Sequence, residues 1–213
     1  MVSVEDLERI VHLAHDRGIF LLLDECYVYL NYAGKPVSGG SFTWAKEHIV
    51  ILGSLSKTYS MTGWRAGFAL ASKPVISNLS KLQSQSTSNA TSFVQKAAIA
   101  ALAGSQKCVE EFRAEFIDLR DYMLAKLTAI PGVTCTRPEG AFYVYPNIGA
   151  FLGKGGIKTA TELATRLLHE AHVVTVPGEA FGTSEHIRIS YPVTKQNIDE
   201  GTRRMGEFLG NLK

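Results

Sequence analysis

Apolar residues follow two different spacings in the first part of the chain. Steps of three and four predict a helix that begins after Ser3 and ends near Gly18. Two continuous apolar runs, 19–23 and 49–52, have the length of strands, and such runs are typical of a parallel sheet covered on both faces. The further elements expected here are a strand over 66–71 and helices over about 74–85 and 91–103.

The pattern changes after residue 104. Apolar steps of three and four predict one long helix, which Pro131-Gly132 closes. Short strands separated by prolines and glycines follow it. The strands are expected at 133–136, 141–145, 173–176 and 186–191, and further helices at about 160–171 and 195–212.

These patterns predict an α/β fold in two parts. Residues 1–104 are expected to form part of a large domain built on a partial, mostly parallel sheet. Residues 105–213 are expected to form the long linking helix and a smaller α+β domain.

Composition and charge exclude several classes of function. The formal net charge of +2 is too small for a general attraction to nucleic acid or to a membrane surface, and no apolar run is long enough to span a bilayer. The three widely spaced cysteines form no CxxC pair and are interpreted as reduced thiols of a cytoplasmic protein. The histidine pairs in HLAH (12–15) and HEAH (169–172) lack a third ligand, so no metal site is expected.

Polar residues stand where the first two predicted strands end. Asp24 follows the first strand, and Ser54, Ser56 and Lys57 follow the second. Ligands of open α/β sheets bind beyond the carboxyl ends of the strands. If the two strands are parallel neighbours, Asp24 and Lys57 emerge at the same edge, where they could form a simple ion pair or a reactive site.

Four ordered motifs favour the reactive site. DECY (24–27) and SLSKTYSMTGWRAGF (54–68) together resemble the pyridoxal-phosphate site of class I, fold-type-I aminotransferases. EGAFYVYPN (139–147), PGEAFG (177–182) and RISY (188–191) resemble later segments of aspartate-aminotransferase-like members, in the same order. The resemblance covers the whole chain and implies the second half of the fold-type-I large domain, followed by the small C-terminal domain.

The resemblance also implies a role for each residue. Lys57 would bond to the aldehyde of pyridoxal 5'-phosphate and then act as the general base. Asp24 would keep the pyridine nitrogen of the cofactor protonated, and Tyr27 would hydrogen-bond its phenolate oxygen.

Three residues of the 54–68 motif match the family's phosphate-binding positions. They are Ser54, Arg65 and, as a weaker candidate, Ser56, and their hydroxyl and guanidinium groups suit a dianion. Arg188, within an apolar strand-like stretch, would bind the α-carboxylate of the substrate as a bidentate pair, the alternative being an interdomain salt bridge.

The implied reaction is transamination between an amino acid and a 2-oxo acid, as part of amino-acid metabolism, by an enzyme whose full-length form is a homodimer. Elimination or decarboxylation on the same fold is an alternative. A further alternative is the sensing half of a transcription regulator, which needs an upstream helix-turn-helix region. The last alternative is a non-catalytic fragment.

The resemblance begins at about the point where the family's NPxNPTG segment would have ended. The chain is therefore expected to correspond to the C-terminal half of a family member. With only three strands of the large sheet, it is expected to leave apolar faces and sheet edges uncovered, to associate, and to be a poor catalyst alone.

Overall fold

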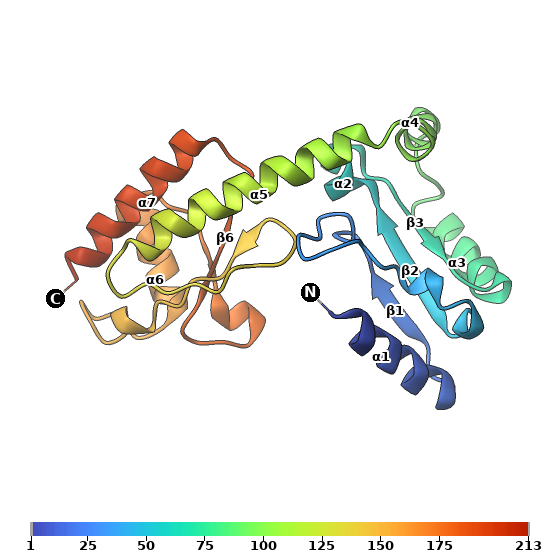
Figure 1. Cartoon of the computed structure of the whole chain (residues 1–213), viewed down its shortest axis with the longest axis horizontal. Helices are drawn as coiled ribbons and strands as arrows, with labels where there is room; N and C mark the ends of the chain where they lie inside the picture. The colour runs from blue at the N-terminus through green and yellow to red at the C-terminus, as the bar shows by residue number, and fades with distance from the viewer. Residues whose placement is uncertain (1, 213) are drawn as a thin grey trace. The chain divides into compact units, whose positions relative to one another are not determined.

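The computed structural model describes residues 2–212 and divides into two compact units, one up to Arg113 and one from Ala114 onward (Figure 1). The division lies inside helix α5 (Lys107–Thr128), whereas the sequence placed the whole of this helix with the second part. The first turns of α5 belong to the first unit, where Arg113 Nε donates a hydrogen bond to the carbonyl oxygen of Asn31 at 2.7 Å.

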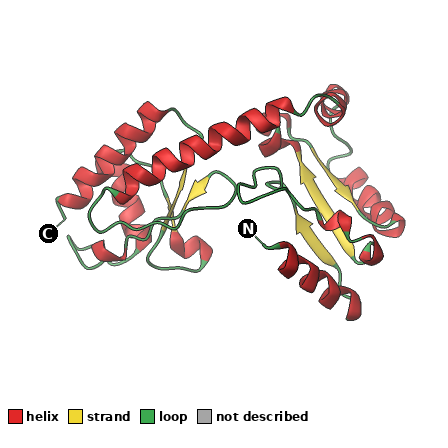
Figure 2. Ribbon diagram, in the orientation of Figure 1, coloured by secondary structure: helices red, strands yellow, loops and turns green. Residues whose placement is uncertain are grey.

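The sheet of the first unit has three strands in the order β1-β2-β3 (Figure 2). These are β1 (Leu21–Asp24), β2 (Ile49–Ser54) and β3 (Gly67–Leu70). β1 and β2 are parallel, as expected, but β3 runs antiparallel to β2. The connection between β2 and β3 contains only a four-residue helix, α2 (Leu55–Thr58), and one 3-10 turn, η3 (Thr62–Trp64), so it has no crossover helix long enough to return the chain for a parallel pairing.

Helix α1 (Val4–Asp16) and two 3-10 turns, η1 (Gly39–Ser41) and η2 (Thr43–Ala45), accompany this sheet. Ser3 caps α1, because its hydroxyl oxygen accepts a hydrogen bond from the amide of Asp6 at 3.0 Å. One small core unites these elements with one face of the sheet. Its members are Val11, Ala45, Ile49 and Ile51, with Leu7, Leu21, Leu23 and Phe42 packed against them.

The opposite face of the sheet is only partly covered within the described residues, with Val50 buried and its neighbours exposed. Leu22 is 63% exposed and Leu52 is 37% exposed. No residue of helix α3 (Lys73–Ser86) is fully buried, and Val94 is the one buried residue of helix α4 (Ser92–Ala103). The sequence expectation that both faces of this sheet are covered is therefore wrong for this chain, while the expectation of uncovered apolar faces is confirmed.

The second unit contains a small antiparallel sheet in the order β4-β6-β5. Its strands are β4 (Tyr143–Val144), β5 (Val176–Pro177) and β6 (Ile187–Ser190). The strand predicted at 133–136 is wrong, since only Thr134 pairs there, in an isolated bridge with Asn147.

Three helical segments complete this unit together with the second part of α5. Helix α6 (Ala160–Arg166) continues as a π-helical turn, η5 (Leu167–Ala171), and α7 (Lys195–Gly210) is the last helix. Two 3-10 turns, η4 (Gly149–Phe151) and η6 (Gly178–Phe181), lie in the connections. The core is larger than that of the first unit, and its fully buried members include Leu127, Val144, Leu163, Ile187 and Met205.

A buried arginine ties the loop after α5 to that helix. Arg120 donates from Nε to Asp121 Oδ1 at 2.8 Å and from Nη1 to the carbonyl oxygen of Pro138 at 3.1 Å. Arg137 donates to the other oxygen of Asp121 at 2.8 Å. The hydrogen bond from Arg120, with support from Arg137, holds the pKa of Asp121 below its ordinary value of 3.8.

The lowered pKa of Asp121 predicts a loss of stability in acid. A carboxyl group with a lowered folded-state pKa stabilises the fold above its unfolded pKa, and this contribution is lost as pH falls through the folded pKa. Asp121→Asn should remove this dependence below about pH 4, with an effect of at most about 1 kcal/mol because the side chain is partly exposed. Chemical denaturation between pH 2 and 6 checks it, with Glu115→Gln on the same helix as the control. An unchanged acid slope in Asp121→Asn would contradict the prediction.

The open face of the first sheet predicts self-association of the chain. Replacing Leu22 and Leu52 by lysine should lower the mass seen by light scattering at micromolar concentration, because the substitutions charge the exposed apolar face. The free energy of unfolding should change by less than about 0.5 kcal/mol per site, since both side chains are exposed. Leu168→Lys, at a residue 45% exposed in the second unit, is the matched control. If the protein without substitutions is monomeric over the whole concentration range, the predicted self-association is refuted.

Candidate functional site

The parallel pairing of β1 with β2 brings the polar ends of both strands to one edge of the first sheet. Asp24 lies opposite Leu52 in the register. The amide of Glu25 extends the pairing by donating a hydrogen bond to the carbonyl oxygen of Leu52 at 2.9 Å. β2 then ends at Ser54, two residues further on, so both strands deliver polar side chains to the same edge.

The Asp24 carboxylate is exposed at this edge and bends the chain that follows it. Its Oδ1 atom accepts a hydrogen bond from the amide of Cys26 at 3.1 Å, which starts a turn. Tyr27 lies within that turn and is half-buried, and its carbonyl oxygen accepts from the amide of Leu30 at 2.9 Å. Leu30 is fully buried, so the turn is anchored at its far end.

A short helix, α2 (Leu55–Thr58), begins directly where β2 ends. Ser54 is its N-cap, and its hydroxyl oxygen accepts a hydrogen bond from the amide of Ser56 at 3.1 Å. The two end residues of the helix are almost completely buried, with exposed fractions of 2% and 3%. Their burial fixes the rotation of the helix, and Lys57 is held half-buried between them.

The Lys57 ammonium lies close enough to the β1 edge to act on the thiol of Cys26. Burial, followed by a hydrogen bond and the negative charge of Asp24, raises the pKa of Cys26 to about 11. The positive charge of Lys57 opposes this rise. Asp24 and Lys57 therefore act electrostatically on one intervening side chain.

The loop after α2 returns to the same edge and carries Arg65. The amide of Leu55 donates to the carbonyl oxygen of Ala66 at 3.3 Å, and the Thr62 hydroxyl donates to the carbonyl oxygen of Ser56 at 3.2 Å. Arg65 has a left-handed backbone (φ 53°), and its Nη1 donates to the carbonyl oxygen of Thr62 at 3.1 Å. Arg65 takes part in none of the ion pairs of residues 2–212, so its charge is not offset by a protein carboxylate.

Gly53 is a residue of this site that sequence reasoning missed. A Cβ atom added there would lie 2.2 Å from the ring of Phe68 on β3. The absence of a side chain leaves room for the Phe68 ring to lie over β2, and the pairing of the two strands places Gly67, the first residue of β3, opposite Ser54. The available signal was a glycine inside an otherwise apolar strand, just before the capping serine.

Arg188 belongs to the second unit, on β6, and is half-buried. Its guanidinium carbon lies 4.6 Å from the ring centroid of Tyr143 and 4.7 Å from that of Phe181. Its Nε atom is buried and has no hydrogen-bond partner among the described residues. Neither ring was assigned a role from the sequence, although both lie within the quoted motifs.

The predicted site residues thus fall into two groups. Asp24 and Tyr27 follow β1, Ser54 ends β2, and the other members of the first group lie on α2 or on the loop that enters β3 at the same edge. Arg188 belongs to the second unit.

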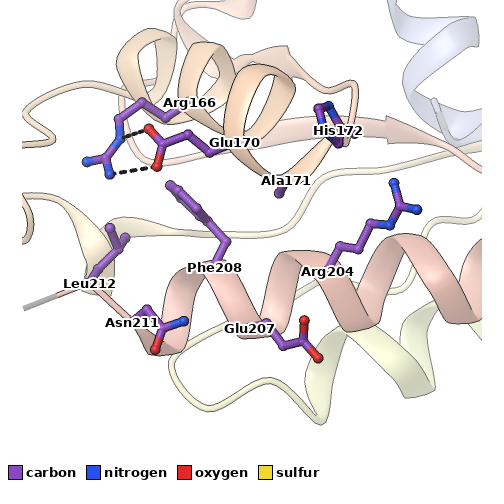
Figure 3. A pocket seen from close by; sticks show the side chains of 9 residues that line it. All are labelled: Arg166, Glu170, Ala171, His172, Arg204, Glu207, Phe208, Asn211 and Leu212. Carbon is purple, nitrogen blue, oxygen red and sulfur yellow. Dashed lines mark hydrogen bonds and ion pairs between the residues drawn. The ribbon is translucent and has the colours of Figure 1, made fainter.

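The hollow drawn in Figure 3 lies elsewhere in the second unit, between η5 and α7, and has a volume of about 420 Å³. Its charged side chains are already paired within the protein. Arg166 binds both carboxylate oxygens of Glu170, at 2.6 and 3.1 Å, and Arg204 and Glu207 pair with neighbours on α7. None of the predicted site residues lines this hollow.

No cluster of three or more histidine, cysteine, aspartate or glutamate side chains among the described residues could hold a metal ion. No helix in the described part of the chain combines the length and apolar character needed to cross a membrane.

Comparisons with known proteins agree with the order of the motifs. The family profile "Aminotransferase class I and II" matches residues 1–205. An aspartate aminotransferase of Geobacillus stearothermophilus is 38% identical over 209 residues, which is 97% of this chain and 53% of that protein. The chain therefore spans about half the length of the curated relatives it matches.

Solved structures resemble the whole described fold. The aspartate aminotransferase of Rhizobium meliloti matches with a TM-score of 0.92 and 34% identity, covering 100% of this chain and 55% of that one. An aromatic aminotransferase of Pyrococcus horikoshii matches with a TM-score of 0.89 and 31% identity, covering 99% and 56%. The family profile, which covers most of the residues, and these relatives together show that the chain belongs to the class I and II aminotransferase family.

Proposed function

We propose that this chain carries the cofactor-binding and carboxylate-binding residues of a pyridoxal 5'-phosphate-dependent aminotransferase of the aspartate aminotransferase type. The reaction is the transfer of an amino group between an amino acid and a 2-oxo acid. The observation that carries the proposal is the β1–β2 register, in which Asp24 stands beside the strand that passes directly into the helix of Lys57. Family membership and the aminotransferases named among its relatives support it.

The donor set at the edge of the first sheet fits this cofactor. The hydroxyls of Ser54 and Ser56 and the guanidinium of Arg65 suit a phosphate dianion, and no carboxylate of residues 2–212 pairs with Arg65. The exposed Asp24 carboxylate suits a protonated ring nitrogen, and Lys57 supplies an amine for the aldehyde. Tyr27 would donate a hydrogen bond from its hydroxyl group to the phenolate oxygen of the ring.

When bound, pyridoxal 5'-phosphate supplies an aldehyde that bonds to amines and a ring that withdraws electrons from the substrate Cα. Asp24 holds a proton at the ring nitrogen, which strengthens that withdrawal. Lys57 would act as the general base that takes the proton from the substrate Cα, and its ammonium would be the acid that gives a proton back. The buried ends of α2 hold this helix in place, which limits where the Lys57 amine can reach.

Arg188 would orient the substrate by its α-carboxylate. A guanidinium binds a carboxylate through two parallel hydrogen bonds, which fixes direction as well as distance. Its buried Nε without a partner supports an external anion as the missing acceptor.

The wider setting follows from the same proposal. The chain would act in amino-acid metabolism in the cytoplasm, and the complete enzyme would be a homodimer. Cys26, Cys108 and Cys135 are all free thiols, which suits a reducing compartment. Amino acids and 2-oxo acids would be its partners, with no role for nucleic acid or a membrane.

Covalent trapping tests the assignment of Lys57 without requiring turnover. Incubation with pyridoxal 5'-phosphate, borohydride reduction and peptide mass mapping should place most of the label on Lys57. A preference of roughly tenfold over an exposed lysine such as Lys73 corresponds to about 1.4 kcal/mol, which phosphate hydrogen bonds can supply. Lys57→Ala should abolish that label, and Lys73→Ala should leave it unchanged. Equal labelling of the two lysines would contradict the assignment of Lys57 as the lysine that bonds to the aldehyde.

The phosphate assignment is tested by comparing two aldehydes. Arg65→Ala should reduce trapping by pyridoxal 5'-phosphate roughly tenfold, because a charge-assisted contact is lost. Trapping of pyridoxal, which lacks the phosphate, should not change. A parallel loss for both aldehydes would mean that Arg65 acts on the loop structure instead.

The thiol of Cys26 reports whether Asp24 and Lys57 are neighbours in solution. Because the positive charge of Lys57 lowers the pKa of Cys26, Lys57→Met should raise that pKa further and slow alkylation at fixed pH. Asp24→Asn should have the opposite effect, since the hydrogen bond and charge of Asp24 raise the pKa. Iodoacetamide rates at Cys26 between pH 8 and 11 measure both shifts, with the exposed Cys108 as the internal control. Identical pH profiles in both variants would show that the three groups do not interact.

A further inference from the structure

The guanidinium of Arg188 is held by rings rather than by a carboxylate. Its central carbon lies 4.6 Å from the ring centroid of Tyr143 and 4.7 Å from that of Phe181. None of the ion pairs formed within residues 2–212 includes Arg188. We call the two side chains Tyr143 and Phe181 the aromatic clamp.

The two rings reach Arg188 from separate elements. Tyr143 on β4 is paired with Ser190 on β6, and side chains two residues apart on a strand share a face, so Tyr143 and Arg188 lie on the same face of the small sheet. Phe181 ends the turn η6, which follows β5. The position of the guanidinium therefore depends on the pairing of β4 with β6, which places Tyr143, and on the turn η6, which places Phe181.

The turn that carries Phe181 is tightly closed. A Cβ atom added to Gly178 would lie 2.5 Å from the carbonyl oxygen of His186, and the Gly178 amide donates to that same oxygen at 2.8 Å. The amide of Thr183 donates back to the carbonyl oxygen of Gly178 at 3.1 Å. This closure leaves the position of Phe181 little freedom.

Phe181 is also supported by Tyr145. The two rings are edge-on, with centroids 6.0 Å apart, and Tyr145 is itself stacked on His186 at 4.8 Å with an interplanar angle of 11°. The Tyr145 hydroxyl hydrogen-bonds the Thr183 hydroxyl. The side chains behind Phe181 thus form a continuous row of ring contacts that starts at His186, two residues before Arg188.

A second arginine in the same unit provides a contrast. The guanidinium of Arg166 lies 5.2 Å from the ring centroid of Phe208, but its Nε and Nη2 atoms both bind Glu170 (Figure 3). A ring contact alone orients a guanidinium without neutralising its charge. Arg166 is oriented and neutralised, whereas Arg188 is oriented and keeps its charge and a buried N–H group for an external acceptor.

We propose that Tyr143 and Phe181 are positioning residues that hold the Arg188 guanidinium in the orientation required to bind the substrate carboxylate. The inference rests on the proposed role of Arg188 and deepens it. The clamp restricts the guanidinium in the free protein, so that less side-chain freedom is lost when the carboxylate binds.

Titration of the full chain with succinate, a simple dicarboxylate, tests the clamp directly. The Arg188 Nε–H resonance, assigned with Arg188→Lys, should shift as succinate binds. Phe181→Leu and Tyr143→Leu should each weaken binding roughly three- to tenfold, because each removes one cation–π contact. Phe208→Leu, which removes a ring from the already neutralised Arg166, is the matched control and should bind like the unchanged protein.

Two further readouts separate positioning from general destabilisation. Hydrogen exchange of Arg188 Nε–H with water should accelerate in the two clamp variants and not in Phe208→Leu. Phe181→Tyr keeps the ring and should restore both binding and slow exchange. Phe181 is 47% exposed, so its replacement by leucine should leave the thermal unfolding midpoint nearly unchanged.

Unchanged succinate affinity and unchanged Nε–H exchange in both clamp variants would overturn the clamp. No response of Arg188 to succinate in the unchanged protein would overturn the carboxylate assignment, and the clamp with it. Trapping of pyridoxal 5'-phosphate on Lys57 is independent of both results, so the failure of the cofactor assignment is recognised separately.

Discussion

The parallel pairing of β1 with β2 is the constraint on which the candidate site depends. Ile49 and Ile51 are buried against the α1 side of the sheet, and their partners Leu21 and Leu23 pack against the same core. A shift of one residue would turn these apolar side chains outward, so burial on one face fixes the register. Because Asp24 ends β1 and α2 begins directly after β2, the same register sets the positions of Asp24 and of the start of α2. The small core of the first unit thus positions the chemistry at its edge.

The same register explains why the parallel pairing of the first two strands could be predicted from the sequence, whereas other parts of the fold could not. Asp24 and Lys57 follow strands whose apolar runs are long enough to recognise in the sequence. Because these strands are parallel neighbours, the two residues leave the sheet at the same edge. The antiparallel return of β3 depends on loop length and on Gly53, which accepts the Phe68 ring beside it, and neither has a periodic signal. The strand expected at 133–136 failed for a related reason, because strand formation needs a partner as well as suitable residues.

Long-range contacts between side chains were beyond the reach of the sequence pattern. Tyr143, Phe181 and Arg188 are brought together by two pairings of β6 and by a closed turn. Propensity and periodicity describe near neighbours along the chain, and they do not reveal which rings will meet an arginine. The exposure of Leu22 was also unpredictable from its run alone, since a run of five apolar residues looks the same whether or not its second face is covered.

The treatment of positive charge distinguishes structural arginines from candidate functional ones. Arg120 and Arg166 are bound by carboxylates supplied by nearby residues, so their charges are neutralised within the fold. Arg65 and Arg188 are held by a backbone carbonyl and by aromatic rings, which fix a guanidinium in place but leave its charge. A cation that is oriented but not neutralised is suited to bind an external anion. Arg65 lies at the edge of the first sheet and Arg188 on the small sheet of the second unit, and these are the two arginines for which we propose a phosphate and a carboxylate as ligands.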